Sequence, residues 1–137
     1  MKLVPILLIF ILTGCSSRIL TVRTEYINEE YLASYHVETP DPALYNPPVG
    51  QRLIIHWHLT CACDDMYLRL QVRYRNREEN VIKVPISIKS GYYCYTLLDE
   101  EYCRTRGILT YRVELICDGC VVTEWRHQLW ADLIEFQ

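Results

Sequence analysis

The residues best suited to chemistry in this chain are cysteines and histidines gathered in two short stretches. The first is "HWHLTCAC" (residues 56–63) and the second is "CDGC" (residues 117–120). Their candidate functional side chains are His56, His58, Cys61, Cys63, Cys117 and Cys120. Thiolates and imidazoles bind zinc, and thiols form or exchange disulfides, so these residue types indicate a metal site, a disulfide framework or a redox site. Which chemistry applies depends on the elements that position them.

Those elements are predicted to be strands, because hydrophobic residues recur with period two along most of the chain. In "RLIIHWHL" the set Leu53, Ile55, Trp57 and Leu59 alternates with Arg52, Ile54, His56 and His58. "MYLRLQVRYR" and "GILTYRVELIC" alternate in the same way. The pattern predicts seven strands, at residues 30–38, 52–59, 66–75, 81–88, 92–98, 107–117 and 121–129.

Seven short strands separated by turns predict an all-β fold, a single immunoglobulin-like or fibronectin-III-like antiparallel β-sandwich. Trp57 or Trp125 would pack between the sheets, and Tyr111 is a candidate for the tyrosine corner of such domains. Pro85 lies inside the fourth predicted strand, which indicates a sheet edge because proline cannot donate to a ladder.

The apolar residues of the last two strands predict whether the connection between them has an odd or an even number of residues, which we call the parity of this hairpin. The sixth strand is expected to bury Leu109, Tyr111, Val113 and Leu115, and the seventh to bury Val121, Thr123, Trp125, His127 and Leu129. Both sets are odd-numbered, so the connection must contain one residue more than a two-residue turn. We expect a type I turn over Cys117 and Asp118, with Gly119 left-handed in a G1 bulge.

In such a sandwich the loops after the second, fourth and sixth strands lie at one end. This topology predicts that the two cysteine-bearing stretches meet, with three outcomes open: cross-loop disulfides, partly paired thiols that link to other chains, or a zinc site. The zinc site would use Cys61, Cys63, Cys117 and Cys120, with His56 or His58 as substitute ligands. Cys94 and Cys103 would pair only if the loop between them folds back. Six cysteines allow 15 pairings, so the sequence alone cannot choose.

The other candidate side chains fit structural roles. His56 and His58 are expected on a solvated strand face, His127 in the core, and Arg69, Arg73 and Arg75 on a solvated face or paired with glutamates across strands. No serine stands in a nucleophile-elbow motif and no phosphate-binding glycine motif is present. The sequence therefore predicts no enzyme and no cofactor.

The N-terminus, "MKLVPILLIFILTGCSS", carries Lys2 and then an apolar run over residues 3–12 that fits a secretory signal. Its end, "LTGC", resembles the lipobox of bacterial lipoproteins. The resemblance implies a signal peptide at residues 1–14 and lipidation of Cys15. We expect a lipidated tether at 15–28 and a β-sandwich domain at 29–137. Ser16 and Ser17 follow the cysteine, which by the same resemblance favours the outer membrane, with the domain facing the periplasm or the cell surface.

The segments "GQRLIIHWHL", "GILTYRVEL" and "EWRHQLW" behind this lipobox resemble small envelope lipoproteins of the chlamydial type, a family with no activity to transfer. The whole chain has a net charge of −3, and removing the leader takes away one lysine and no acid, which leaves −4. An acidic domain does not suit nucleic acid. We expect a lipid-anchored structural or protein-interaction module with an envelope protein partner. The alternative is a metal-binding or thiol-redox lipoprotein that uses the cysteine cluster.

Overall fold

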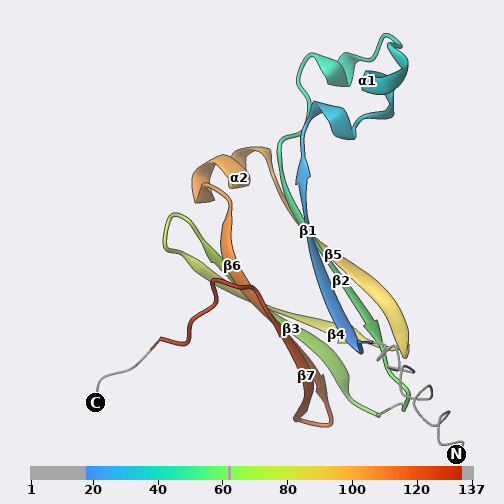
Figure 1. Cartoon of the computed structure of the whole chain (residues 1–137), viewed down its shortest axis with the longest axis vertical. Helices are drawn as coiled ribbons and strands as arrows, with labels where there is room; N and C mark the ends of the chain where they lie inside the picture. The colour runs from blue at the N-terminus through green and yellow to red at the C-terminus, as the bar shows by residue number, and fades with distance from the viewer. Residues whose placement is uncertain (1–17, 62, 134–137) are drawn as a thin grey trace, which may run out of the picture.

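The computed structural model describes residues 18–61 and 63–133, and these residues form a β-sandwich (Figure 1). One sheet has the strand order β1-β2-β5 and the other has the order β4-β3-β6-β7. The strands are β1 (Leu20–Ile27), β2 (Gly50–His58), β3 (Met66–Tyr74), β4 (Glu79–Ile86), β5 (Ser90–Leu98), β6 (Ile108–Cys117) and β7 (Cys120–Arg126). Every pairing is antiparallel. The predicted all-β, immunoglobulin-like sandwich of seven strands is confirmed.

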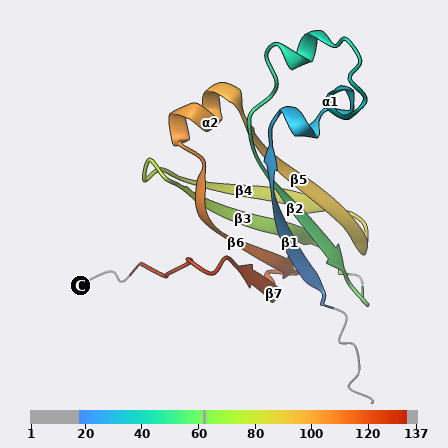
Figure 2. The ribbon, with the colours of Figure 1, turned by 45° about the horizontal axis from the view of Figure 1, so that its top comes forward.

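The core forms where the inner faces of the two sheets meet (Figure 2). β2 and β3 bury every second residue, as their sequence alternation requires. Fully buried examples are Leu53 and Ile55 from β2 and Leu68, Leu70 and Val72 from β3. Trp57 is also buried, and its indole Nε1 donates a hydrogen bond to the carbonyl of Ile88 at 3.0 Å. Pro85 lies in β4, which is an edge strand as predicted.

The prediction for the first strand was wrong. Residues 30–38 contain the 3-10 helix η1 (Glu29–Tyr31) and the short helix α1 (Ala33–Val37). The first strand is β1, which lies inside the expected tether and pairs along its whole length with β2. The folded domain therefore begins at Leu20 and not at residue 29. The physical reason is local: the Asn28 side chain accepts a hydrogen bond from the N–H of Glu30 and so starts a helical turn, and Glu38 ends α1 in a left-handed conformation.

The expected core set of β6 needs one correction. Leu109 is 46% exposed, whereas its neighbour Ile108 is 6% exposed. The ladder between β3 and β6 shifts register here, because Arg73 pairs with Thr110 but Tyr74 pairs with Ile108. Leu109 is therefore the extra residue of a β-bulge and turns outward. Tyr111, Val113 and Leu115 are buried as predicted.

The last hairpin has the predicted parity but not the predicted turn. Cys117 pairs directly with Cys120, and Asp118 and Gly119 both have positive φ (47° and 80°), which is a two-residue turn of type I′. The extra residue, Val122, lies further along β7. Ile116 of β6 pairs with Val121, whereas the preceding Leu115 pairs with Thr123, so Val122 has no partner in the ladder. Thr123 and Trp125 thus share the core side, while Val121 and Leu129 are exposed at 51% and 65%, contrary to expectation.

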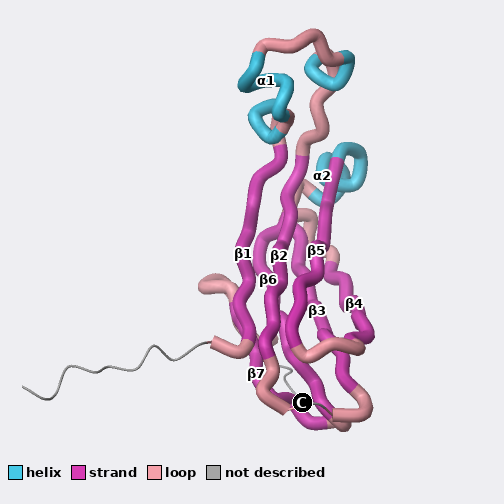
Figure 3. Tube along the Cα trace, turned by 90° about the vertical axis from the view of Figure 1, so that its right-hand side faces the viewer, coloured by secondary structure: helices cyan, strands magenta, loops and turns pink. Residues whose placement is uncertain are grey.

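The sandwich has two different ends. At one end the connection between β1 and β2, residues 28–49, projects beyond the strands, and we call it the arm (Figures 1 and 3). It contains η1, α1 and the 3-10 helix η2 (Pro42–Leu44), and helix α2 (Asp99–Thr105) lies at the same end. At the opposite end β1 begins, β2 runs into β3, and β6 turns into β7.

In the described part of the chain, no helix has both the length and the apolar character needed to cross a membrane. The expected signal peptide and the expected lipidation residue Cys15 lie outside the described residues.

Candidate functional site

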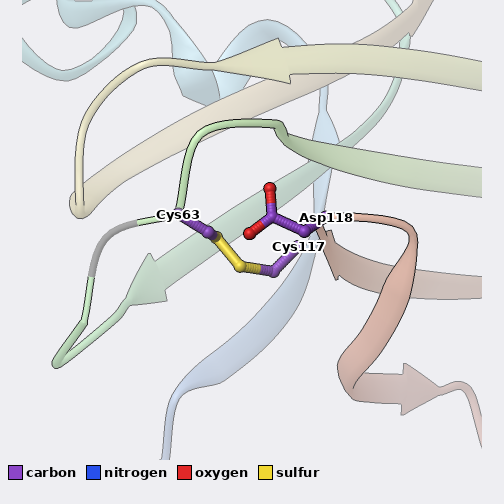
Figure 4. Close-up of side chains that lie close together, drawn as sticks. All are labelled: Cys63, Cys117 and Asp118. Carbon is purple, nitrogen blue, oxygen red and sulfur yellow. A yellow bond between two sulfur atoms is a disulfide. The ribbon is translucent and has the colours of Figure 1, made fainter.

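The two cysteine-bearing stretches meet at the end of the sandwich opposite the arm (Figure 4). Cys63, just before β3, and Cys117, the last residue of β6, form a disulfide with their Cα atoms 6.0 Å apart. This distance lies inside the usual window for a bonded pair. The register of β3 against β6 explains the meeting, because Met66 lies opposite Cys117. The predicted contact between the two loops is confirmed, with one cross-loop disulfide.

Two backbone-centred hydrogen bonds reinforce this junction. The N–H of Asp65 donates to the Asp118 carboxylate at 3.0 Å, and the N–H of Asp118 donates to the carbonyl of Asp65 at 2.8 Å. Asp118 also begins the type I′ turn, where its left-handed φ is one that aspartate tolerates better than most residues. The junction therefore combines a covalent bond, a pair of hydrogen bonds and a tight turn.

The other four described cysteines remain unpaired: Cys61, Cys94, Cys103 and Cys120. Cys94 and Cys103 do not pair with each other, because residues between them form the end of β5 and the helix α2 and do not fold back as a loop. Cys61 and Cys120 are exposed at the disulfide end, and Cys103 is exposed on α2. The arrangement is the mixed outcome foreseen from the sequence, a bonded pair with accessible thiols beside it.

A metal would find three candidate ligands at this junction. Within residues 18–61 and 63–133, the one group of His, Cys, Asp and Glu atoms close enough to share an ion is Cys63, Cys117 and Asp118. While the disulfide is intact its sulfur atoms are not thiolates, and only the thiolate is a metal ligand. His56 and His58 lie on the exposed outer face of β2, as predicted, and are not part of this group.

A second cluster of charged residues lies on the outer face of the β4-β3-β6-β7 sheet. Glu114 is only 4% exposed, and Arg69 Nε donates to its carboxylate at 2.5 Å while Arg112 donates to the other oxygen. Burial alone raises the pKa of Glu114, but the hydrogen bonds from both arginines outweigh burial and hold the pKa below its usual range. Glu114 is thus a buried carboxylate that stays ionised and joins two strands.

The segment after β7 covers part of this charged face. The Arg73 guanidinium lies 3.9 Å from the centre of the Trp130 ring, and Arg73 also pairs with Glu79 at 2.8 Å. Asp132 receives hydrogen bonds from Arg112 and Arg126. The expected pairing of the arginine stripe with glutamates across strands is therefore confirmed for Arg69 and Arg73. The covering role of residues 127–133 was missed, although the aromatic and acidic residues in "HQLWADL" were a signal for it.

The arm is a surface that sequence reasoning missed, because residues 30–38 within it were assigned to a strand. Its helical turns contain no buried residue. Tyr31, Tyr35 and Tyr45 are 51%, 43% and 93% exposed, and Val37 is 65% exposed. Exposed aromatic side chains on a projecting segment are typical of protein contact sites. The prolines in "TPDPALYNPP" argue against a strand over residues 39–48, where none was predicted, and so gave no signal against the strand predicted at 30–38.

The predicted core histidine and tyrosine lie against each other near the arm end of the sandwich. His127 follows β7, and its ring lies 5.1 Å from the ring of Tyr111 between centroids. The Tyr111 hydroxyl accepts a hydrogen bond from Thr24 in β1 at 3.3 Å. It therefore ties the two sheets together instead of bonding to backbone a few residues upstream, as a tyrosine corner does.

Comparison with known proteins adds no relative: no family model, no curated protein and no solved structure matches this chain.

Proposed function

We propose that this chain is a lipid-anchored protein-interaction module of a bacterial envelope, and that the arm carries its contact surface. The observation that supports the proposal most directly is the placement of the arm at the end of the sandwich opposite the start of β1. An N-terminal anchor would hold the domain by that start, so the arm would point away from the membrane.

The start of β1 is firmly attached to the sandwich. The carbonyl of Ile19 accepts a hydrogen bond from the N–H of His58 at 2.8 Å, and the Arg18 guanidinium lies over the Trp125 ring at 5.6 Å from its centroid. Cys15 precedes Arg18 by three positions, and three residues span at most about 11 Å. A lipid on Cys15 would therefore keep the disulfide end close to the bilayer.

The strands would then act as a spacer. β1 has 8 residues, which at about 3.4 Å per residue separates the anchor end from the arm by roughly 27 Å. The Cys63–Cys117 disulfide would lock the membrane-proximal end, where the chain enters the fold. Oxidised cysteines fit an exported domain, because disulfides persist outside the cytoplasm.

The anchor is tested by Cys15→Ser in the full chain, followed by palmitate labelling and membrane fractionation. We expect loss of the label and either release from the membrane fraction or accumulation of the uncleaved precursor. Unchanged labelling, mass and fractionation would refute the anchor.

The contact surface is tested in the same full chain with a photoreactive benzoylphenylalanine at Tyr45 in living cells. The matched control places it at Tyr92 in β5, which is 72% exposed but far from the arm in sequence and on another element. We expect an adduct with another envelope protein from Tyr45 and none from Tyr92. Equal yields from both positions, or none from Tyr45, would contradict the interaction role.

A further inference from the structure

The arm lacks the internal packing that normally stabilises a segment of its length. None of its three helical turns buries a residue, so ordering it is not offset by a core of its own. Polar contacts hold it instead: Ser34 donates to Asp41 at 2.6 Å, and the His36 ring bonds to the carbonyl of Glu30 at 2.8 Å. These contacts give the arm a defined shape while leaving its tyrosines uncovered.

All formal charges in the arm have the same sign. Residues 28–49 contain Glu29, Glu30, Glu38 and Asp41, and neither lysine nor arginine. Helix α2 at the same end starts with three more acids, Asp99, Glu100 and Glu101, all exposed. A surface that combines exposed tyrosines with this charge repels anionic lipid and nucleic acid and attracts cations. It also repels a second copy of itself.

The root of the arm already shows how such a surface binds a cation. The Arg52 guanidinium lies 5.0 Å from the centre of the Tyr31 ring and donates to Glu25 at 2.6 Å. One arginine thus binds an aromatic face and a carboxylate together. The hydrogen bond to Glu25, with a smaller contribution from Tyr31, raises the pKa of Arg52 above its usual value and outweighs the lowering by desolvation. Beyond the root, Tyr35 and Tyr45 belong to the same segment as the acids of the arm, and among the described contacts no arginine of this chain lies over either ring.

We infer that the arm is a docking surface for an arginine-bearing, basic surface of another protein. This inference rests on the proposed interaction function and adds the chemistry of the partner. Arginines of the partner would stack on Tyr35 and Tyr45 and pair with Glu29 and Glu38, repeating the contacts that Arg52 makes at the root. Arginine is favoured over lysine because its planar guanidinium stacks and pairs at the same time.

The first test uses defined probes and the full chain in a neutral detergent. The probes are a short arginine-rich peptide and a lysine-rich peptide of the same length and charge, and binding is measured by fluorescence anisotropy at physiological salt. We expect several-fold tighter binding of the arginine peptide. Glu29→Gln with Glu38→Gln should weaken it roughly 3- to 10-fold, in the range of two or more exposed ion pairs. Tyr45→Ala should reduce the preference for arginine over lysine.

The matched control removes two exposed carboxylates from the opposite end, with Asp64→Asn and Asp65→Asn, and should leave both affinities unchanged. All these positions are exposed and outside the core, so circular dichroism should show an unaltered fold. Equal losses from the arm pair and the control pair would mean that only net charge matters, and would overturn the inference. Equal binding of the two peptides would overturn it as well.

The second test separates this inference from the proposed function. Mass spectrometry of the Tyr45 photo-adduct identifies the peptide of the partner that touches the arm. A contacted peptide with an excess of arginine supports the inference. An adduct with a neutral or acidic peptide, or with a second copy of this chain, would leave an interaction role standing and refute the basic partner. Absence of any adduct would instead count against the proposed function itself.

Discussion

Removing the Cys63–Cys117 disulfide should destabilise the domain substantially, and the structure sets the size of the effect. The bond joins residues 54 positions apart. In the chain-entropy model a closed loop of this length removes about 14 cal/mol/K from the unfolded chain, which is about 4 kcal/mol at 25 °C. The free energy of unfolding of a typical domain is only about 5–15 kcal/mol. The bond is thus expected to supply a large share of the stability.

The variant is the full chain with Cys63→Ser and Cys117→Ser, and the assay is urea unfolding followed by tryptophan fluorescence. For an m-value of about 2 kcal/mol/M, a loss of about 4 kcal/mol lowers the midpoint by roughly 2 M. The m-value itself should rise, because an unfolded chain without the cross-link exposes more surface. A reducing agent should shift the wild-type protein to the same midpoint and leave the variant unchanged.

The control is Cys61→Ser with Cys120→Ser, which changes two exposed, unpaired cysteines at the same end and should leave the free energy of unfolding within about 0.5 kcal/mol of wild type. A loss below about 1 kcal/mol in the Cys63/Cys117 variant, far less than the entropy model requires, would refute the reasoning. So would an equal loss in the control, because it would show that another pairing of the cysteines carries the stability.

Three further predictions concern the core, the buried carboxylate and the turn. Trp57→Ala should lower the free energy of unfolding by about 3–5 kcal/mol, while His58→Ala, on the exposed face of the same strand, should change it by less than about 0.5 kcal/mol; similar losses in thermal unfolding would mean that the strand faces are misassigned. Glu114→Gln should cost about 2 kcal/mol at neutral pH, because it leaves Arg69 and Arg112 without their shared carboxylate and replaces hydrogen bonds to a charged group by weaker ones. Since the pKa of Glu114 is lowered in the folded state, its contribution is present above its unfolded pKa of about 4.3 and is lost as the pH falls through the folded pKa, so the stabilities of the two proteins should draw together only in acid, at pH values below that unfolded pKa. Gly119→Ala should cost about 1 kcal/mol through its φ of +80° alone, because a Cβ there meets no atom within 4 Å; a neutral result in urea unfolding would contradict the turn geometry.

The elements that were predicted correctly are those whose signal is local. β2 and β3 alternate apolar and polar residues without interruption, and burial follows that alternation residue by residue. Pro85 placed β4 at an edge because a missing N–H is a property of the residue itself. The parity of the last hairpin was also predictable, since it follows from which residues of β6 and β7 are apolar.

The errors arose where a partner at long range decides the outcome. Residues 30–38 alternate well enough for a strand, but the strand that pairs beside β2 is β1, and residues 30–38 lie in the connection that follows it. Leu109 reads as a core residue until the bulge opposite Arg73 and Tyr74 turns it outward. The position of the extra residue in β7, beyond the turn instead of within it, likewise depends on the ladder with β6.

The sequence by itself determined that this protein is a β-sandwich, which faces of β2 and β3 are buried, and that the two cysteine-bearing stretches meet at one end. Those properties follow from side-chain periodicity and from the alternating direction of antiparallel strands, which are encoded residue by residue. Only the tertiary structure decided that Cys63 bonds to Cys117, that Glu114 is buried between two arginines, and that the arm projects from the far end with its tyrosines exposed. Each of these depends on strand register, and one step of register moves a side chain to the other face of the sheet.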